Sequence, residues 1–140
     1  MKYFVDTSFW CALYNANDEH HQEALAIWKT LASLPLRLYT SDYIFDETIT
    51  LLNHKISHSS AVIWGETLLN SEVANILQVD DRIFSKSWAL FQEYSDKGFS
   101  FTDCTSFVLM EVNQIKLALV FDRHFTQAGF TVNQVAHRSG

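Results

Sequence analysis

Close to the start of the chain, residues 2–8 read Lys-Tyr-Phe-Val-Asp-Thr-Ser. Lys2 to Val5 is a short run of residues that favour β-strands. Asp, Thr and Ser are residue types that cap helices, because their side chains accept hydrogen bonds from the first free amides. The stretch therefore predicts a strand that passes directly into a helix, with Asp6 at the carboxyl end of the strand.

The same alternation of strand and helix continues along the rest of the chain. Apolar runs predict further strands at residues 36–40, 75–79, 117–121 and 130–132. Apolar spacing predicts helices at residues 9–14, 24–31 and 57–69. Capping residues predict three more: one that starts after Ser41 or Asp42, one that starts at residues 80–81 and stops near Gly98, and one that runs from residues 102–103 to about 115. Strands that alternate with helices predict an α/β fold, a three-layer α/β/α sandwich with a central parallel sheet.

Length and composition predict one domain over residues 1–140. Of these residues 48% are hydrophobic, and one proline and four glycines occur, so no flexible linker is indicated. No apolar run approaches the roughly 20 residues that span a bilayer. The first residues also lack the pattern of a secretory signal. We therefore expect a cytoplasmic protein that does not bind membranes.

Charge and cysteine content narrow the function classes. The net charge of −6 argues against a protein that binds nucleic acid through a basic surface. It does not exclude a nuclease, because bound divalent cations offset acids where the substrate lies. Cys11 and Cys104 are too few and too far apart for a disulfide framework or a paired-cysteine zinc motif. We expect both to act as small buried hydrophobes in a reducing compartment.

Two acidic residues follow predicted strands. Asp6 closes the first strand, and Asp122 follows the apolar run 117–121. Ligands of open parallel sheets bind beyond the carboxyl ends of the strands, so the two carboxylates could share one rim. Each could instead be an ordinary turn or helix-capping acid.

Two further acids lie on predicted helices. Helical spacing places Glu47 on one face with Ile44, Thr48 and Leu51, where an acid interrupts an apolar stripe, while Asp46 falls on a more polar side. Glu47 could also bend out to water.

Asp103 stands beside Thr102 at the expected start of a helix, and one of the two is enough to cap it. Capping and a functional role both stay open for Asp103.

Carboxylates that converge need a counter-charge. Two unit charges ~4 Å apart repel by about 4 kcal/mol at an effective dielectric constant of ~20. Carboxylate oxygens are hard ligands suited to Mg²⁺ or Mn²⁺. Such cations activate water for attack on phosphate esters. If the four acids meet, the sequence predicts a metal-dependent enzyme that acts on phosphate esters.

Four fragments in order carry a family resemblance that covers nearly the whole chain. They are Val5-Asp6-Thr7-Ser8, then Asp46-Glu47-Thr48 followed by Leu51-Leu52, then Phe101-Thr102-Asp103-Cys104-Thr105-Ser106-Phe107, and Phe121-Asp122-Arg123-His124-Phe125. With these fragments the chain resembles the PIN domain family, in particular the VapC-type toxins of toxin-antitoxin pairs.

The resemblance implies a small α/β endoribonuclease that uses Mg²⁺ or Mn²⁺. It implies that Asp6, Asp103 and Asp122 bind the metal and that Glu47 is the fourth catalytic acid. It also implies an RNA substrate, a cognate antitoxin as partner, and a homodimer.

The same resemblance makes Ser8 and Thr102 supporting hydroxyl residues. Where many family members carry Thr or Ser two residues before the last acid, this chain has Val120.

Two other function classes stay open. A PIN-like module could bind RNA or protein with little catalysis. A phosphatase on a related fold would use Asp6 as its nucleophile, but such enzymes usually need a second Asp two residues later, where Ser8 stands. A zinc site at His54 and His58 is disfavoured, because no acid lies between them and Ser57 looks like the cap of the next helix.

Several polar and aromatic side chains have no assigned role at this point. Arg123 and His124, and Arg82 and Lys86, could contact an RNA backbone or simply be solvated. His20 and His21 are expected on a solvated face. Aromatic residues including Phe9, Trp10, Tyr14, Trp28, Trp64 and Trp88 are expected in the core or in an exposed patch for a second copy or an antitoxin.

Overall fold

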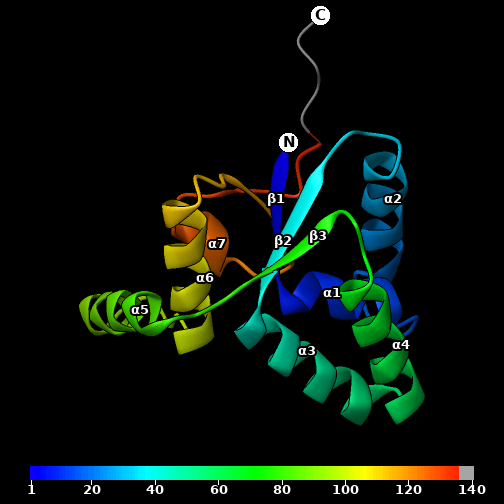
Figure 1. The fold of residues 1–140 in the computed structure, drawn as a ribbon, viewed down its shortest axis with the longest axis horizontal. Coiled ribbons are helices and arrows are strands. Elements are labelled where there is room, and N and C mark those ends of the chain that lie inside the picture. The colour runs from blue at the N-terminus through cyan, green and yellow to red at the C-terminus, as the bar shows by residue number, and fades with distance from the viewer. Residues whose placement is uncertain (136–140) are drawn as a thin grey trace, which may run out of the picture.

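The structure is a computed structural model that describes residues 1–135. Within this range it contains five strands and seven helices (Figure 1). The strands are β1 (Lys2–Val5), β2 (Arg37–Ser41), β3 (Ala74–Leu77), β4 (Leu117–Leu119) and β5 (Thr131–Val132). The helices are α1 (Thr7–Tyr14), α2 (His21–Leu31), α3 (Asp42–Lys55), α4 (His58–Leu69), α5 (Asp81–Glu93), α6 (Phe101–Val112) and α7 (His124–Gln127).

All five strands are parallel, in the order β3-β2-β1-β4-β5. Helices α2 and α4 lie on one side of the sheet, and α6 and α7 lie on the other (Figure 1). Helices α1 and α3 begin at the carboxyl ends of β1 and β2. The predicted three-layer α/β/α sandwich is confirmed.

The core forms around the central strand. Tyr3, Phe4 and Val5 of β1 are fully buried, because parallel sheets carry helices on both faces. On one side Phe4 stacks with Phe125 of α7, their ring centroids 6.3 Å apart. The continuous apolar run of β1 is therefore what is expected of a strand with helices packed on both faces of its sheet.

Several predicted ends of elements are confirmed by side-chain caps. The hydroxyls of Ser41 and Ser57 accept from the amides of Ile44 and Ser60 at the starts of α3 and α4. Because Ser57 separates α3 from α4, His54 and His58 belong to different helices. Within residues 1–135, neither histidine is part of a cluster that could hold a metal ion.

Four expectations about the elements were wrong in detail. Helix α6 starts at Phe101 and is capped by Ser100, not by Thr102 or Asp103. Helix α5 ends at Glu93, and Gly98 lies in the following loop with φ +69°. Strands β3 and β4 are shorter than predicted, and the one-turn helix α7 was not predicted.

The cysteines and most of the aromatic residues are internal. Cys11 and Cys104 are free and buried, as predicted. Burial raises the pKa of both thiols to about 11, so they are poor nucleophiles. Trp10 and Trp64 are buried and pack edge to face, whereas Trp88 is 52% exposed. Among the helices of residues 1–135, none has the length and apolar character needed to cross a bilayer.

Candidate active site

The candidate site lies where the strand order reverses. From β1 the chain builds β2 and β3 on one side of the sheet and later β4 and β5 on the other. Ligands of open α/β sheets bind at such a switch point, beyond the carboxyl ends of the strands. Here the amide of Asp6 donates to the carbonyl of Leu119 at 3.0 Å, so the ends of β1 and β4 lie side by side.

A pocket of about 490 Å³ opens at this point. Its lining includes all four predicted acids and Ser8. The full lining is Asp6, Thr7, Ser8, Cys11, Asp18, Glu19, His20, Glu47, Leu51, Lys55, Ser100, Asp103, Phe121, Asp122 and His124. The fold thus brings together acids from four separate elements or loops of the chain.

Asp6 is held by Ser8. Its Oδ2 accepts from the Ser8 amide at 3.1 Å and from the Ser8 hydroxyl at 2.7 Å. The same hydroxyl accepts from the amide of Phe121 at 3.0 Å, so Ser8 ties the end of β1 to the segment that follows β4. Both hydrogen bonds to Asp6 use Oδ2, and the described residues leave its Oδ1 without a donor.

Asp6 is the most electrostatically perturbed of the acids. The side chain is buried, and no Lys or Arg of the described residues forms an ion pair with it. Burial raises the pKa of Asp6 from 3.8 to about 7; the Ser8 hydrogen bonds oppose this, and the charges of Asp122 and Asp103 add to it. An acid in this condition is stabilised in its ionised form by a bound cation.

Asp103 occupies the third position of α6 in a capping box. Its amide donates to the Ser100 hydroxyl, and its Oδ2 accepts from the Ser100 amide at 3.0 Å. Oδ2 also lies 2.8 Å from Nδ1 of His124. These contacts fix the carboxylate and leave its Oδ1 free of donors from the described residues.

Asp122 lies in the turn between β4 and α7. Its Oδ1 accepts from the amide of His124 at 2.9 Å. Burial raises the pKa of Asp122, and this hydrogen bond partly offsets the effect. One potential ligand atom from each of Asp103, Asp122 and His124 lies within 4.8 Å of the others.

Glu47 faces the same pocket from α3. Its helix starts at the end of β2, and the Thr48 hydroxyl donates to the Thr7 hydroxyl of α1 at 3.1 Å. This buried contact fixes the rotation of α3 against α1 and turns Glu47 and Leu51 toward the acids. Asp46, one residue earlier, is exposed, as predicted.

Two supporting positions differ from the resemblance. Thr102 does not line the pocket of the acids; it lines a neighbouring depression together with Tyr43 and Glu47. Val120 is fully buried, and the side-chain amide of Asn133 holds its backbone through two hydrogen bonds of 3.0 and 2.7 Å. Ser8 supplies the hydroxyl that supports the end of β4 in this chain.

The donor set fits a hard divalent cation. Asp6 and Asp103 each present one oxygen that has no other donor, and Asp122 and Glu47 add further carboxylates around the same pocket. Mg²⁺ and Mn²⁺ favour such oxygen ligands, whereas Zn²⁺ favours nitrogen and sulfur. Cys11 lines the pocket too, but its raised thiol pKa makes it a poor ligand.

Several pocket residues had no assigned role from the sequence. His124 contacts two of the acids, although its sequence position suggested only an RNA contact or a solvated side chain. Its place two residues after Asp122 is the signal that could have indicated this. His20 is packed flat against Phe121, not simply solvated. Lys55 lines the pocket, whereas Lys86 lines a separate depression between α5 and α6.

Comparisons with known proteins agree with this geometry. The family model described as PIN domain matches residues 3–131. The chain is 39% identical over 127 residues to the 23S rRNA-specific endonuclease VapC20 of Mycobacterium tuberculosis, covering 91% of this chain and 94% of the relative. It is 32% identical over 128 residues to a VapC ribonuclease of Archaeoglobus fulgidus, covering 90% of this chain and 80% of the relative.

Solved structures show the same likeness. The crystal structure of M. tuberculosis VapC20, described as a sarcin-ricin loop cleaving toxin, has a TM-score of 0.84 and 36% identity and covers 92% of this chain and 96% of its own. VapBC2 from Rickettsia felis shares the fold, with a TM-score of 0.67 and 12% identity. The match covers 94% of this chain and 97% of that chain. The chain therefore belongs to the PIN domain family, among the VapC-type toxin ribonucleases.

Proposed function

We propose that this protein is an endoribonuclease that depends on Mg²⁺ or Mn²⁺ and acts as the toxin of a type II toxin-antitoxin pair. Asp6, Asp103 and Asp122 hold the cation, and Glu47 is the fourth catalytic acid. We also propose that the chain is a single domain, as its length and composition indicate. The observation that carries the proposal is the meeting of these four acids in one pocket at the reversal of strand order.

A bound divalent cation supplies Lewis-acid activation of water and neutralises charge on the phosphate. The chain's own residues supply the geometry. Ser8 contacts Oδ2 of Asp6 and His124 contacts Oδ2 of Asp103, which leaves the Oδ1 atom of each acid available to a ligand in the pocket that both line. Glu47 would orient a water and accept its proton as the water attacks phosphorus. The bond from phosphorus to the leaving ribose oxygen then breaks, and that oxygen takes a proton from solvent.

Ser8 also bears on whether Asp6 could be the nucleophile of a phosphatase. Its hydroxyl stands where a phosphatase with a nucleophilic aspartate would need its second acid, and it donates to Asp6. A phosphatase reading of Asp6 is thereby disfavoured. Thr102 lines the neighbouring depression with Glu47, and we propose that its hydroxyl supports the site from there without a direct contact to the metal.

The RNA and the partners follow from the relatives. VapC20 is described as specific for 23S rRNA, so this RNA is the first substrate to test. We assign the protein to the cytoplasm, where its two free thiols stay reduced. It is kept inactive there by a cognate antitoxin.

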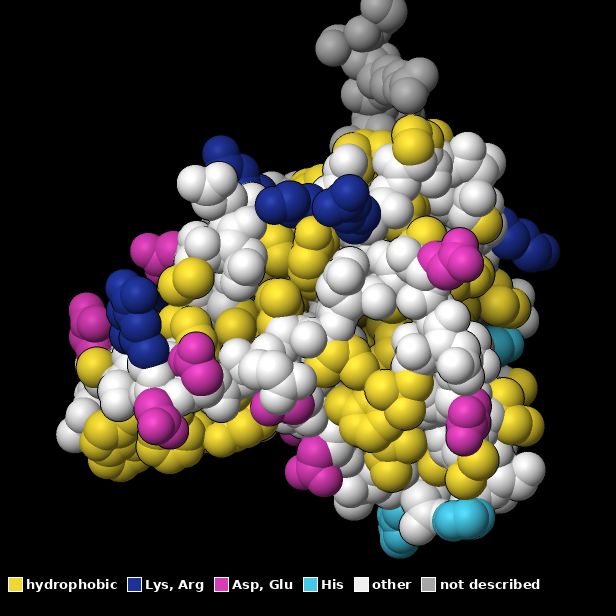
Figure 2. Space-filling view, viewed as in Figure 1, with side chains coloured by type: hydrophobic (Ala, Val, Ile, Leu, Met, Phe, Trp, Pro, Cys, Tyr) yellow, Lys and Arg dark blue, Asp and Glu magenta, His cyan; other side chains and the backbone are white. Residues whose placement is uncertain are grey.

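We also propose a homodimer. Apolar side chains gather over α5 at the lower left of Figure 2. Phe84, Trp88 and Phe91 of this helix are 48%, 52% and 39% exposed. Aromatic side chains of this kind are enriched in protein interfaces. A Trp88→Glu variant should shift the mass in solution from dimer to monomer, and an unchanged mass excludes this face.

Cleavage assays test the enzyme. Ribosomes, purified RNA and a small phosphomonoester are each incubated with the protein in Mg²⁺, Mn²⁺ or EDTA. We expect RNA cleavage that needs the metal, no release of phosphate from the monoester, and loss of cleavage in Asp6→Asn and Asp103→Asn. Asp96→Asn, which removes an exposed acid, is the charge-matched control. Cleavage by either site variant at the rate of the control would exclude the proposed roles.

A further inference from the structure

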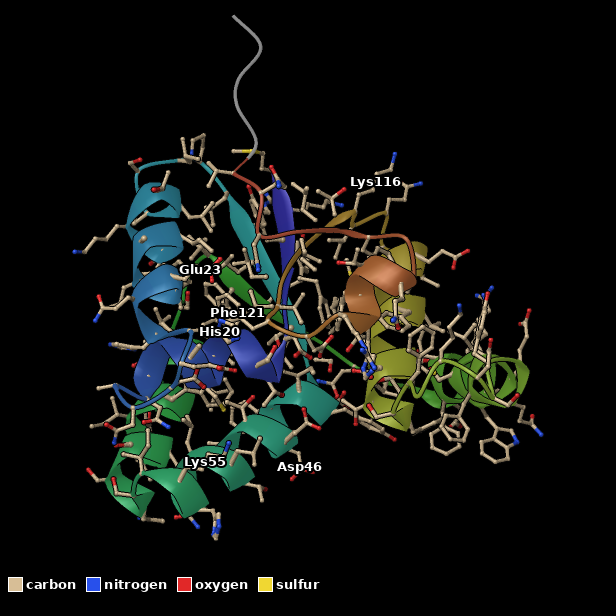
Figure 3. All side chains as sticks on the ribbon, turned by 180° about the vertical axis from the view of Figure 1, so that it is seen from behind. His20, Glu23, Asp46, Lys55, Lys116 and Phe121 are labelled. Atoms are coloured by element: carbon tan, nitrogen blue, oxygen red, sulfur yellow. The ribbon has the colours of Figure 1, made fainter. Side chains whose placement is uncertain are left out.

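A stack of three aromatic rings runs from the core to the rim of the pocket. Phe9 and Phe121 are nearly parallel, at 9° with centroids 5.5 Å apart, and Phe121 and His20 are parallel within 1° at 4.5 Å. Exposure increases outward, from a buried Phe9 to a His20 side chain that is 37% exposed. Figure 3 shows His20 beside Phe121, which directly precedes Asp122 in the chain.

Stacking on Phe121 orders the outermost ring. Nε2 of His20 lies 3.3 Å from Glu19 and Nδ1 lies 3.7 Å from Glu23, but these carboxylates are largely exposed and add little. The face of His20 that packs on Phe121 is covered before any ligand arrives. A flat ligand that stacks on such a ring loses little free energy in ordering the protein.

Lys55 lines the same pocket from the last turn of α3. It is eight residues after Glu47 and four after Leu51, so all three share one face of the helix. The rise per residue puts it about 12 Å along the axis from Glu47. Among the described residues that line the pocket it is the one Lys or Arg, and it forms no ion pair.

These features suit a nucleotide chain better than a lone phosphate. The pocket of about 490 Å³ is lined by an aromatic ring and a lysine in addition to the four acids. The net charge of −6 gives no general attraction for RNA. Affinity must come from local contacts, and aromatic stacking and a lysine are the contacts that bind single strands.

We propose that the His20–Phe121 stack holds an unpaired base beside the scissile phosphate and that Lys55 binds a backbone phosphate further along α3. The inference rests on the proposed RNA substrate and makes that substrate single-stranded at the cut. A paired base is already stacked on both faces and offers no free face to His20. Duplex RNA is then not bound at this pocket.

Binding measurements test this without depending on cleavage. A labelled, unstructured 12-nucleotide RNA of mixed sequence and its duplex are titrated in Mg²⁺ with the Glu47→Gln protein. His20→Ala and Lys55→Gln are then added singly to that background. Each should raise Kd for the single strand about tenfold. Lys55→Gln should also reduce the slope of log K against log salt by about 0.7.

Two matched variants sharpen the result. His20→Phe keeps the ring plane and should bind within about twofold of the parent. Lys86→Gln removes an exposed lysine of α5, outside the pocket, and should bind like the parent. The thermal unfolding midpoint of each variant verifies that it is folded.

The outcomes separate this inference from the proposed function. If the unsubstituted protein cleaves RNA but His20→Ala and Lys55→Gln bind the single strand as Lys86→Gln does, this inference is wrong and the nuclease stands. The same holds if the duplex binds as tightly as the single strand. If the unsubstituted protein cleaves no RNA, the proposed function fails, whatever the binding data show.

Discussion

Nδ1 of His124 lies 2.8 Å from Oδ2 of Asp103, which joins the first turn of α7 to the first turn of α6. The His124 ring also packs edge to face on Phe99, with centroids 5.6 Å apart. Residues that hydrogen-bond to a ligating carboxylate fix its orientation and tune its affinity for metal. We therefore expect His124 to act as a positioning residue for Asp103.

Replacing His124 by Phe should weaken metal binding. The substitution keeps an aromatic ring against Phe99 and removes the nitrogen beside Asp103. Loss of such a contact costs about 10- to 100-fold in metal affinity or activity. Calorimetric titration with Mn²⁺ measures the affinity, and His54→Phe, at an exposed position of α3, is the control. Equal affinities for the two variants would contradict the role given to His124.

Ser8→Ala should destabilise the protein and impair the site together. The change removes the hydroxyl that donates to Asp6 and accepts from Phe121. The Phe121 amide is partly buried, so leaving it unpaired costs up to about 1–3 kcal/mol. Chemical denaturation should show this loss, and Ser95→Ala, in an exposed turn, should not. A Ser8→Ala protein with unchanged stability and metal affinity would show that the hydroxyl does not support the site.

Asp6→Asn should change how the stability of the metal-free protein depends on pH. The folded pKa of Asp6, about 7, lies above 3.8, so the folded state binds the proton more tightly than the unfolded state. This carboxyl therefore lowers stability as pH rises from about 4 to about 7, and the rise in pKa corresponds to roughly 4 kcal/mol.

Denaturation in EDTA at several pH values checks this. The stability of Asp6→Asn relative to the unsubstituted protein should grow from pH 4 to pH 7 and then level off. Comparing the two proteins cancels the titration of groups remote from Asp6, whereas the neighbouring Asp103 and Asp122, whose charges raise the pKa of Asp6, contribute over the same pH range. A constant difference across this range would mean that Asp6 is not a strained, buried acid.

Glu47→Gln should stop cleavage without a comparable loss of stability. Glu47 accepts no hydrogen bond from the described residues, so the amide replaces it without breaking a contact. Asp46→Asn is the matched control, because it removes the same charge one residue earlier on an exposed side of α3 (Figure 3). Rates of RNA cleavage should fall at least about 100-fold for Glu47→Gln and stay near normal for the control. Equal rates would remove Glu47 from the chemistry.

Much of the site could be predicted because its acids break simple patterns. Asp6 and Asp122 follow apolar strands, and the carboxyl ends of parallel strands share an edge. Glu47 interrupts an apolar helical face, which the Thr48 contact with Thr7 turns toward that edge. The order of the strands was not predicted, and this order is what places β4 beside β1.

The roles of the two histidines depend on contacts with residues far away in the chain. His20 and His124 gain their roles from Phe121 and Asp103, which are about 100 and 21 residues away in the chain. Helix α7 has four residues, too few for a periodic signal. The cap of α6 was misplaced because Ser100, Thr102 and Asp103 are all good capping residues.

A crystal grown with Mn²⁺ and measured at the manganese absorption edge shows whether the acids bind a cation. We expect an anomalous peak in contact with carboxylate oxygens of Asp6, Asp103 and Asp122, with Glu47 facing it directly or through a water. A peak elsewhere on the molecule, or none at saturating Mn²⁺, would mean that these acids do not form a metal site.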